Sequence, residues 1–313
     1  MNRLFRDVDG GPLCPQGSVA CIGAFDGLHL GHQALLGHAA ARARALGVAS
    51  VALSFEPLPR EVFARPAPPR LMLSRQKVAA LWELGIDLAG LLRFDAAFAA
   101  MSAETFARRV LVERLGVREV WVGPGFRFGS KRGGTLATLH RIGEACGFVA
   151  GEIAPVSVDG ERVSSTRLRE LLQAGDFAAA ARLLGRAYTI AGRVVRGAQL
   201  GRKLGFPTAN LRYPKVPPLR GIFAVRVHGV GDAPRPGVAS FGTRPTVDGD
   251  EPLLEAHLFG FDGDLYGRCI EVEFVARLRD EQRFDDLPAM VEQMKRDAAQ
   301  ARAILGTPAQ ASA

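Results

Sequence analysis

The segment at residues 18–32, SVACIGAFDGLHLGH, constrains the fold of this chain more than any other. The apolar residues at its start predict a strand, and the apolar spacing that follows it predicts a helix. Three glycines between them allow a close approach to a ligand or a positive φ: Gly23, Gly27 and Gly31. Amide groups at a helix start also attract anions. The segment therefore predicts a strand, a tight turn and a helix, with an anion site between His29 and His32.

Two histidines at such a place suit phosphorus chemistry. Imidazole N–H groups and backbone amides can be aimed at the charge that develops when a phosphate becomes five-coordinate. The pattern Gly-x-Phe-Asp-Gly-x-His-x-Gly-His resembles the HxGH nucleotidyltransferases and, within them, the flavin adenylyltransferases. The resemblance implies that His29 and His32 are catalytic. It also implies that nucleotide phosphates bind at Gly23, Phe25, Asp26, Gly27 and Gly31.

The first part of the chain alternates apolar runs with helical patterns. Further strands are predicted at 48–55, 86–94, 117–123 and 148–153, and helices at 74–85, 102–116 and 135–147. This alternation predicts an α/β fold, a doubly wound, Rossmann-like parallel sheet whose ligands bind at the carboxyl ends of the strands. The glycine-rich turns after the first and fourth strands would meet there. The proline-rich segment 56–70 is either a flexible loop over this edge or a plain surface connection.

The pattern changes near residue 185. Short alternating strands are predicted at 188–195, 222–230, 236–242, 253–261 and 268–278, and an amphipathic helix closes the chain. These elements predict a small antiparallel β-barrel followed by a C-terminal helix. We expect two domains, at residues 1–185 and 186–313, because 313 residues are enough for two cores.

The segment at 164–169, SSTRLR, precedes a predicted helix. Its Ser165 and Thr166 are either N-caps or ligands of phosphate oxygens, and Arg169 lies one turn further along. Ser-Thr-x-x-Arg is the partner motif of HxGH in the nucleotidyltransferase superfamily. The resemblance implies that Ser165 and Thr166 bind the nucleotide and that Arg169 is catalytic, supporting the departing pyrophosphate.

The segment at 197–210, GAQLGRKLGFPTAN, resembles the riboflavin kinase signature. Its loop can wrap phosphates, although it is not a Walker P-loop. The phosphate-binding residues are predicted to be Gly201, Lys203 and Gly205. Thr208 and Asn210 supply hard oxygen ligands of the kind that hold Mg²⁺ beside substrate phosphates.

Glu255 lies on a predicted strand whose alternation gives it either a solvent-facing or a functional position. By resemblance to the kinase family it is the catalytic base that takes the proton from the ribityl 5′-hydroxyl. The stretch RDEQRF that follows the last predicted strand also resembles that family. This resemblance implies a flavin site formed by Arg279, Glu281 and Phe284.

Together, in this order, the motifs resemble the bacterial bifunctional riboflavin kinase/FMN adenylyltransferases, often called FAD synthetases. The resemblance implies that the C-terminal barrel phosphorylates riboflavin to FMN. The N-terminal domain would then join FMN to AMP, making FAD and releasing pyrophosphate. ATP, riboflavin, FMN and FAD are the expected partners, flavins being substrates and products, with Mg²⁺ accompanying ATP. We expect a monomer or weak oligomer.

Two positions depart from the family pattern. Ala24 replaces an asparagine, and Gly125 stands where VGxDFxFG or VGxNFxFG places a polar side chain near the nucleotide. One alternative is therefore a riboflavin kinase with a weakened or non-catalytic nucleotide-binding N-terminal domain. Cytidylyl or pantetheine transfer would share the first motif but leaves the Pro-Thr-Ala-Asn segment unexplained.

The net charge of +8 suits polyphosphates or nucleic acid. The chain has three tyrosines and two tryptophans, none in a cluster with basic residues, so we expect no nucleic-acid partner. Four cysteines are scattered along the sequence, with no CxxC pair and no metal-ligand spacing. The first residues lack an apolar signal, and no apolar run approaches the roughly 18 to 20 residues of a membrane span, so we expect a cytoplasmic protein with no membrane partner.

Overall fold

The computed structural model describes residues 2–197, 205–246 and 249–306. The chain divides into two compact units, one formed by Met1–Pro68 and Met72–Ser165 and the other by Pro69–Leu71 and Thr166–Ala313. The helices at Ser165–Ala174 (α7) and Phe177–Leu184 (α8) thus group mainly with the second unit. The division into domains at residue 185 stays a prediction, because compactness alone does not say which helices serve which site.

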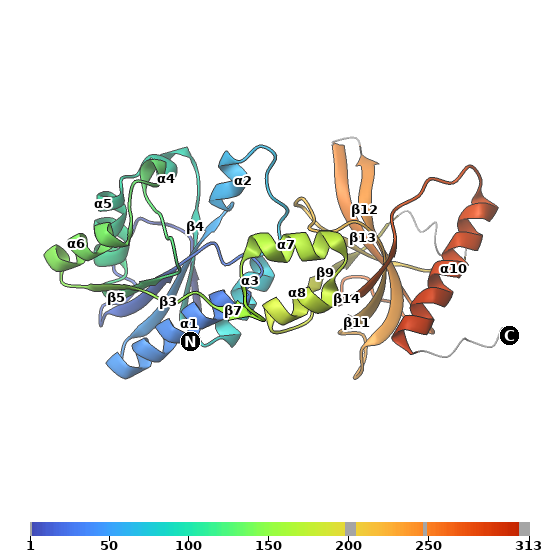
Figure 1. Ribbon diagram of the computed structural model, residues 1–313, viewed down its shortest axis with the longest axis horizontal. Coiled ribbons are helices and arrows are strands. Elements are labelled where there is room, and N and C mark those ends of the chain that lie inside the picture. Colours follow the sequence, from blue (N-terminus) through green and yellow to red (C-terminus); the bar gives the residue numbers. More distant parts are fainter. Residues whose placement is uncertain (1, 198–204, 247–248, 307–313) are drawn as a thin grey trace. The chain divides into compact units, whose positions relative to one another are not determined.

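The first unit is built on a six-stranded parallel sheet with the order β1-β4-β3-β2-β5-β6 (Figure 1). Its strands are β1 (Arg3–Phe5), β2 (Ser18–Ile22), β3 (Ala49–Glu56), β4 (Leu88–Arg93), β5 (Val117–Val122) and β6 (Val149–Glu152). After β2 the chain adds β3 and β4 on one side of that strand, and then β5 and β6 on its other side. The predicted doubly wound sheet is confirmed. Strand β1 was not predicted, because three residues at a sheet edge carry almost no pattern.

Helices cover both faces of this sheet. They are α1 (Leu30–Leu46), α2 (Pro59–Phe63), α3 (Ser74–Glu83), α4 (Ala96–Ala100), α5 (Ala103–Phe106), a π-helical stretch (Ala107–Arg114), a 3₁₀ turn (Ser130–Arg132) and α6 (Leu136–Cys146). Successive residues of β2 enter opposite cores: Val19 packs with α1 and Ala20 with the π-helical stretch. Burial on both faces explains why these strands are apolar throughout. A short hairpin of β7 (Ser157–Val158) and β8 (Glu161–Arg162) follows.

The two glycine-rich turns of the first unit lie at one edge of the sheet. Ile22, the last residue of β2, is the register partner of Val122, the last residue of β5. The strand order also reverses between these two strands, and ligands of open α/β sheets bind at such switch points. The prediction that both turns meet at one place is therefore confirmed.

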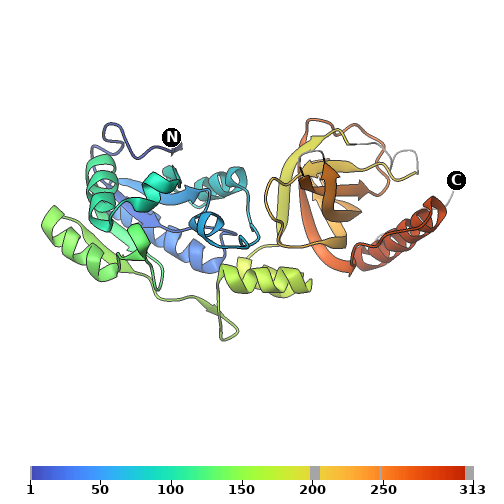
Figure 2. The ribbon, with the colours of Figure 1, turned by 90° about the horizontal axis from the view of Figure 1, so that it is seen from above.

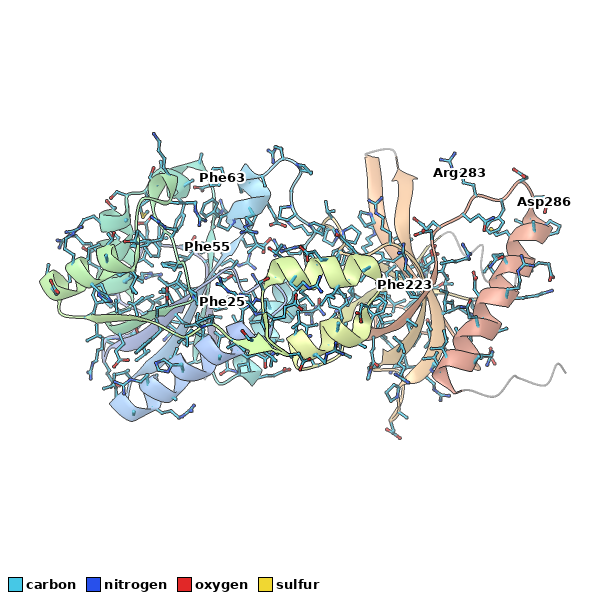
Figure 3. All side chains as sticks on the ribbon, viewed as in Figure 1. Phe25, Phe55, Phe63, Phe223, Arg283 and Asp286 are labelled. Atoms are coloured by element: carbon cyan, nitrogen blue, oxygen red, sulfur yellow. The ribbon has the colours of Figure 1, made fainter. Side chains whose placement is uncertain are left out.

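The second unit contains a closed antiparallel barrel with the order β10-β13-β12-β11-β14-β9. Its strands are β9 (Thr189–Val195), β10 (Ala209–Arg212), β11 (Gly221–His228), β12 (Arg235–Thr246), β13 (Gly249–Leu258) and β14 (Cys269–Arg279). Aromatic rings fill its centre: Phe274 packs against Phe241 and against Phe223, which is labelled in Figure 3. The C-terminal helix α10 (Leu287–Leu305) packs against the barrel (Figure 2). The barrel and its helix are confirmed, but β10 was not predicted.

Among the described residues, no helix is both long enough and apolar enough to cross a membrane.

Candidate functional sites

The turn between β2 and α1 presents His29 as the N-cap of the helix. Its Nδ1 accepts a hydrogen bond from the backbone N–H of His32 at 3.3 Å, so the neutral His29 ring carries its proton on Nε2. The two rings stack with centroids 3.7 Å apart. His29 therefore offers an N–H donor at the helix start, where anions are stabilised.

This turn has an unfavourable backbone. Phe25 and Leu28 both have φ of 47°, a region that residues other than glycine rarely occupy. Phe25 is fully buried, and its ring meets the edge of His32 at a centroid distance of 5.4 Å. A Cβ at Gly23 would lie 2.9 Å from the Phe25 ring, so glycine is required there. Backbone strain of this kind persists only where surrounding contacts hold it, and it concentrates at functional sites.

Asp26 braces the turn. Its carboxylate Oδ1 accepts the Met72 N–H at 3.1 Å, and its carbonyl accepts the Ser165 hydroxyl at 2.9 Å. The side chain is 2% exposed. Asp26 and Ser165 thus have structural partners at positions predicted to bind the nucleotide, and direct contacts with phosphate stay a prediction. Gly31 lets the His29 ring lie close to the helix, because a Cβ there would be 3.3 Å from that ring.

His32 is held neutral. Burial, then the neighbouring His29 ring and the charge of Lys77, lower the pKa of His32 well below 6.5. Its Nδ1 is buried and has no hydrogen-bond partner within the described part of the chain. At pH 7 the ring is therefore an uncharged imidazole, which can donate an N–H to a phosphate oxygen.

Thr166 and Arg169 belong to the second unit. There the Arg169 Nε donates to the Pro69 carbonyl at 2.6 Å. Their predicted position beside the histidines stays a prediction.

Gly125, in the turn after β5, has φ of 73°, and its N–H donates to Glu152 at 3.2 Å. Apart from its two chain neighbours, no heavy atom of the described residues lies within 4 Å of the place where a Cβ would stand. The side chain that the family pattern has here would therefore meet open space.

We expect Gly125→Asn to preserve both the fold and FAD formation, because asparagine tolerates positive φ better than other residues with a side chain. Gly125→Val should lower the free energy of unfolding by about 1–2 kcal/mol, because a β-branched residue is strained there. Thermal unfolding and an FAD-formation assay on both variants measure this. Equal loss of stability in both would contradict the backbone argument.

An aromatic cluster in the first unit was not predicted from the sequence. Neighbouring ring centroids lie 5.5–6.0 Å apart among Phe55, Phe63, Phe94, Phe98, Phe106, Phe126 and Phe128. Phe63 ends the cluster and is 66% exposed (Figure 3). The available signal in the sequence was Phe55, near the end of β3, and Phe94, directly after β4.

The second candidate site centres on β10. Asn210 is the direct register partner of Glu255 on β13, so both side chains lie on one face of the barrel wall. The Asn210 Nδ2 donates to the Thr208 carbonyl at 3.2 Å, whereas the buried Oδ1 has no hydrogen-bond partner among the described residues. A Cβ at Gly197 would lie 2.8 Å from that Oδ1, so glycine keeps this space open.

Two adjoining cavities share Thr208. One, of about 70 Å³, is lined by Asn210 and by residues of the loop after β13, including Asp264 and Tyr266. The other, of about 270 Å³, is lined by Glu255 and by all three predicted flavin ligands, Arg279, Glu281 and Phe284. The structure thus brings the predicted metal ligands, base and flavin ligands together. Gly205 has φ of 81°, whereas Gly201 and Lys203 lie outside the described residues.

The larger cavity is closed on one side by an ion pair. Arg279 contacts the Asp297 carboxylate of α10 at 2.7 Å, and its guanidinium lies 5.9 Å from the centroid of the Phe284 ring. Partial burial raises the pKa of Glu281, and Arg220 opposes that shift. A Cβ at Gly242 would collide with the Glu281 carboxylate.

His257 was not identified from the sequence, although it lies two residues after Glu255 and on the same face of β13. Its Nδ1 lies 2.9 Å from the Pro207 carbonyl, so Nδ1 carries the proton. Burial lowers the pKa of His257, the Pro207 carbonyl raises it, and Arg302 lowers it further. The ring ties β13 to the segment that carries Thr208.

Comparisons with known proteins cover both units. Residues 12–167 match the family described as FAD synthetase, and residues 184–305 match the family described as riboflavin kinase. The bifunctional riboflavin kinase/FMN adenylyltransferase of Escherichia coli (strain K12) is 42% identical over 97% of this chain and 98% of its own. That of Pseudomonas fluorescens is 46% identical over 92% of this chain and 93% of its own. A crystal structure described as a macrolide-efflux protein from Streptococcus pneumoniae has a TM-score of 0.77 at 27% identity, covering 96% of this chain and 99% of that one.

Proposed function

The chain belongs to the bifunctional riboflavin kinase/FMN adenylyltransferase family, and we propose how its residues divide the two reactions. The enzyme phosphorylates riboflavin with ATP, giving FMN and ADP. It then adenylylates FMN with a second ATP, giving FAD and pyrophosphate. The alternative of a kinase with an inactive N-terminal domain is not favoured, because full-length relatives with both activities match both units.

The pairing of Asn210 with Glu255 supports the kinase assignment most strongly. The larger cavity accommodates the flavin, and the smaller one accommodates part of the nucleotide. The two substrates would then meet at Thr208. There the Glu255 carboxylate takes the proton from the ribityl 5′-hydroxyl as that oxygen attacks the γ-phosphorus of ATP, and ADP leaves.

Thr208 and Asn210 fit a divalent cation. The buried Asn210 Oδ1, which lacks a hydrogen-bond partner among the described residues, is a hard acceptor of the kind that Mg²⁺ binds together with phosphates. Bound Mg²⁺ would neutralise charge on the phosphate oxygens of ATP. Thr208 and Asn210 are the residues that would hold this cation.

Asn210→Ala should raise the Mg²⁺ concentration needed for half-maximal riboflavin phosphorylation by about tenfold or more, since it removes a ligand. FAD formation from supplied FMN should be unchanged. Titrating Mg²⁺ in both assays measures the difference. A parallel shift in both reactions would show that Asn210 does not act at the kinase metal.

In the first unit, the FMN phosphate attacks the α-phosphorus of ATP and pyrophosphate leaves. His29 and His32 donate N–H groups to the oxygens that gain charge, and the amides at the start of α1 add to this stabilisation. Ser165, Thr166 and Arg169, at the start of α7, bind phosphate oxygens of the nucleotide. The exposed Phe63 ring offers a surface on which the FMN ring system can stack.

The protein works in the cytoplasm as a monomer or weak oligomer, with ATP and flavins as its ligands. Free thiols at all four cysteines agree with a reducing compartment.

Chromatographic separation of flavins tests the whole assignment. The purified chain is incubated with ATP and Mg²⁺ and either riboflavin or FMN. We expect FAD in both reactions and transient FMN in the first. FMN accumulation from riboflavin with no FAD in either reaction would contradict the adenylyltransferase assignment.

A further inference from the structure

Lys77 places a buried ammonium group beneath the turn that carries the two histidines. It lies on α3 and is 0% exposed. Its Nζ donates to the Ala24 carbonyl at 2.7 Å and to the Ser54 hydroxyl at 3.1 Å. The Ser54 hydroxyl in turn donates to the same Ala24 carbonyl at 2.9 Å. Two donors from separate elements therefore converge on one carbonyl of the turn.

A lysine at this position is costly for folding. Ammonium groups are almost never fully buried unless they are paired, because burial removes their hydration. Buried acceptors offset part of this cost, since the Ala24 carbonyl and the Ser54 hydroxyl accept hydrogen bonds from the ammonium.

The Ala24 carbonyl stands immediately before the strained part of the turn. Phe25 and Leu28 have φ of 47° and Gly27 has φ of 90°. Such a backbone needs restraint at its ends. One restraint is the hydrogen bond from the Met72 N–H to the Asp26 carboxylate. The other is the hydrogen bond from Lys77 to the Ala24 carbonyl. A small rotation at Ala24 would carry through Phe25 to the His32 ring that it contacts.

The charge of Lys77 also acts on the histidines. It is one of the three causes that keep the pKa of His32 low, after burial and His29. Lys77 thus brings a positive charge close to the His32 ring.

We propose that Lys77 is a positioning residue of the adenylyltransferase site. Through the Ala24 carbonyl it holds the turn in the conformation that binds the triphosphate. This inference rests on the proposed adenylyl transfer in the first unit.

The test is Lys77→Met, which keeps the apolar stem and removes the ammonium. FAD formation from FMN should fall about 100-fold in kcat, the loss expected when a catalytic constellation is misplaced. KM for FMN should change little, and riboflavin phosphorylation should be unchanged. The melting temperature should fall modestly, because the Ala24 carbonyl and the Ser54 hydroxyl lose a buried hydrogen-bond donor. The midpoint of the His32 titration, followed by NMR, should move up.

Ser54→Ala is the matched control. It removes the other donor to the Ala24 carbonyl but keeps the charge, so its effect on kcat should be several-fold smaller and the His32 titration should stay in place. If Lys77→Met retains kcat within about threefold, the inference is wrong. It is equally wrong if kcat falls while the His32 titration does not move. Absence of FAD formation in the unmutated chain would instead contradict the proposed function, and the inference with it.

Discussion

Replacing His32 with alanine should lower FAD formation from FMN by about 10²–10³-fold and leave riboflavin phosphorylation intact. The ring is a neutral donor at the start of α1, stacked on His29 and fixed by Phe25. Removing it takes away one preorganised donor to the charge that develops in the transition state. The kinase reaction is unaffected because its residues lie on the barrel of the other unit.

His38→Ala is the control for that experiment. His38 lies on the same helix, and its ring meets Trp121 edge-on at 4.0 Å rather than the turn. This variant should cost some stability and leave the rate of adenylyl transfer nearly unchanged. Assays of both reactions on each variant separate the two effects. Unimpaired FAD synthesis by His32→Ala would exclude the catalytic role of this ring.

Glu255→Gln should produce the opposite phenotype. Riboflavin phosphorylation should fall by about 10²–10⁴-fold, the usual contribution of a general base. Adenylylation of supplied FMN should continue. Glutamine keeps the shape and the position beside Asn210 but cannot accept the hydroxyl proton. KM for riboflavin should therefore change much less than kcat.

Glu271→Gln on β14 is the control, since that glutamate lines neither of the two described cavities. It should phosphorylate riboflavin at the rate of the unmutated chain. Equal rate losses in the two glutamine variants would indicate a general charge effect instead of a catalytic base. Loss of both reactions in a folded Glu255→Gln protein would contradict two separate sites.

Much of this arrangement could be predicted from the sequence because it is local. The turn with His29 and His32 combines glycines, a helix start and histidines within a single short segment. Strand periodicity likewise indicated the sheet and five of the barrel strands. The strand β10 could not be recognised, because its four residues follow a loop whose glycines and proline dominate the pattern.

Sequence patterns could not predict the contacts that depend on strand pairing or on the burial of side chains. Asn210 and Glu255 become neighbours only through the register of β10 with β13. In the sequence, Lys77 cannot be distinguished from a solvated lysine of an amphipathic helix. It is buried because α3 packs under the turn. The same holds for Asp26, whose carboxylate accepts a hydrogen bond from the Met72 N–H.

The closure of the barrel also determines at which point of its synthesis the chain can form the kinase domain. Strand β9 must pair with β14, which is made last of all the strands. Contacts this distant in sequence form slowly, and domains fold as units from the N-terminus as the chain emerges from the ribosome. The first unit can therefore complete its sheet on the ribosome while the barrel is still open. A chain that stops before β14 would carry a finished nucleotide-binding sheet but no wall to hold riboflavin.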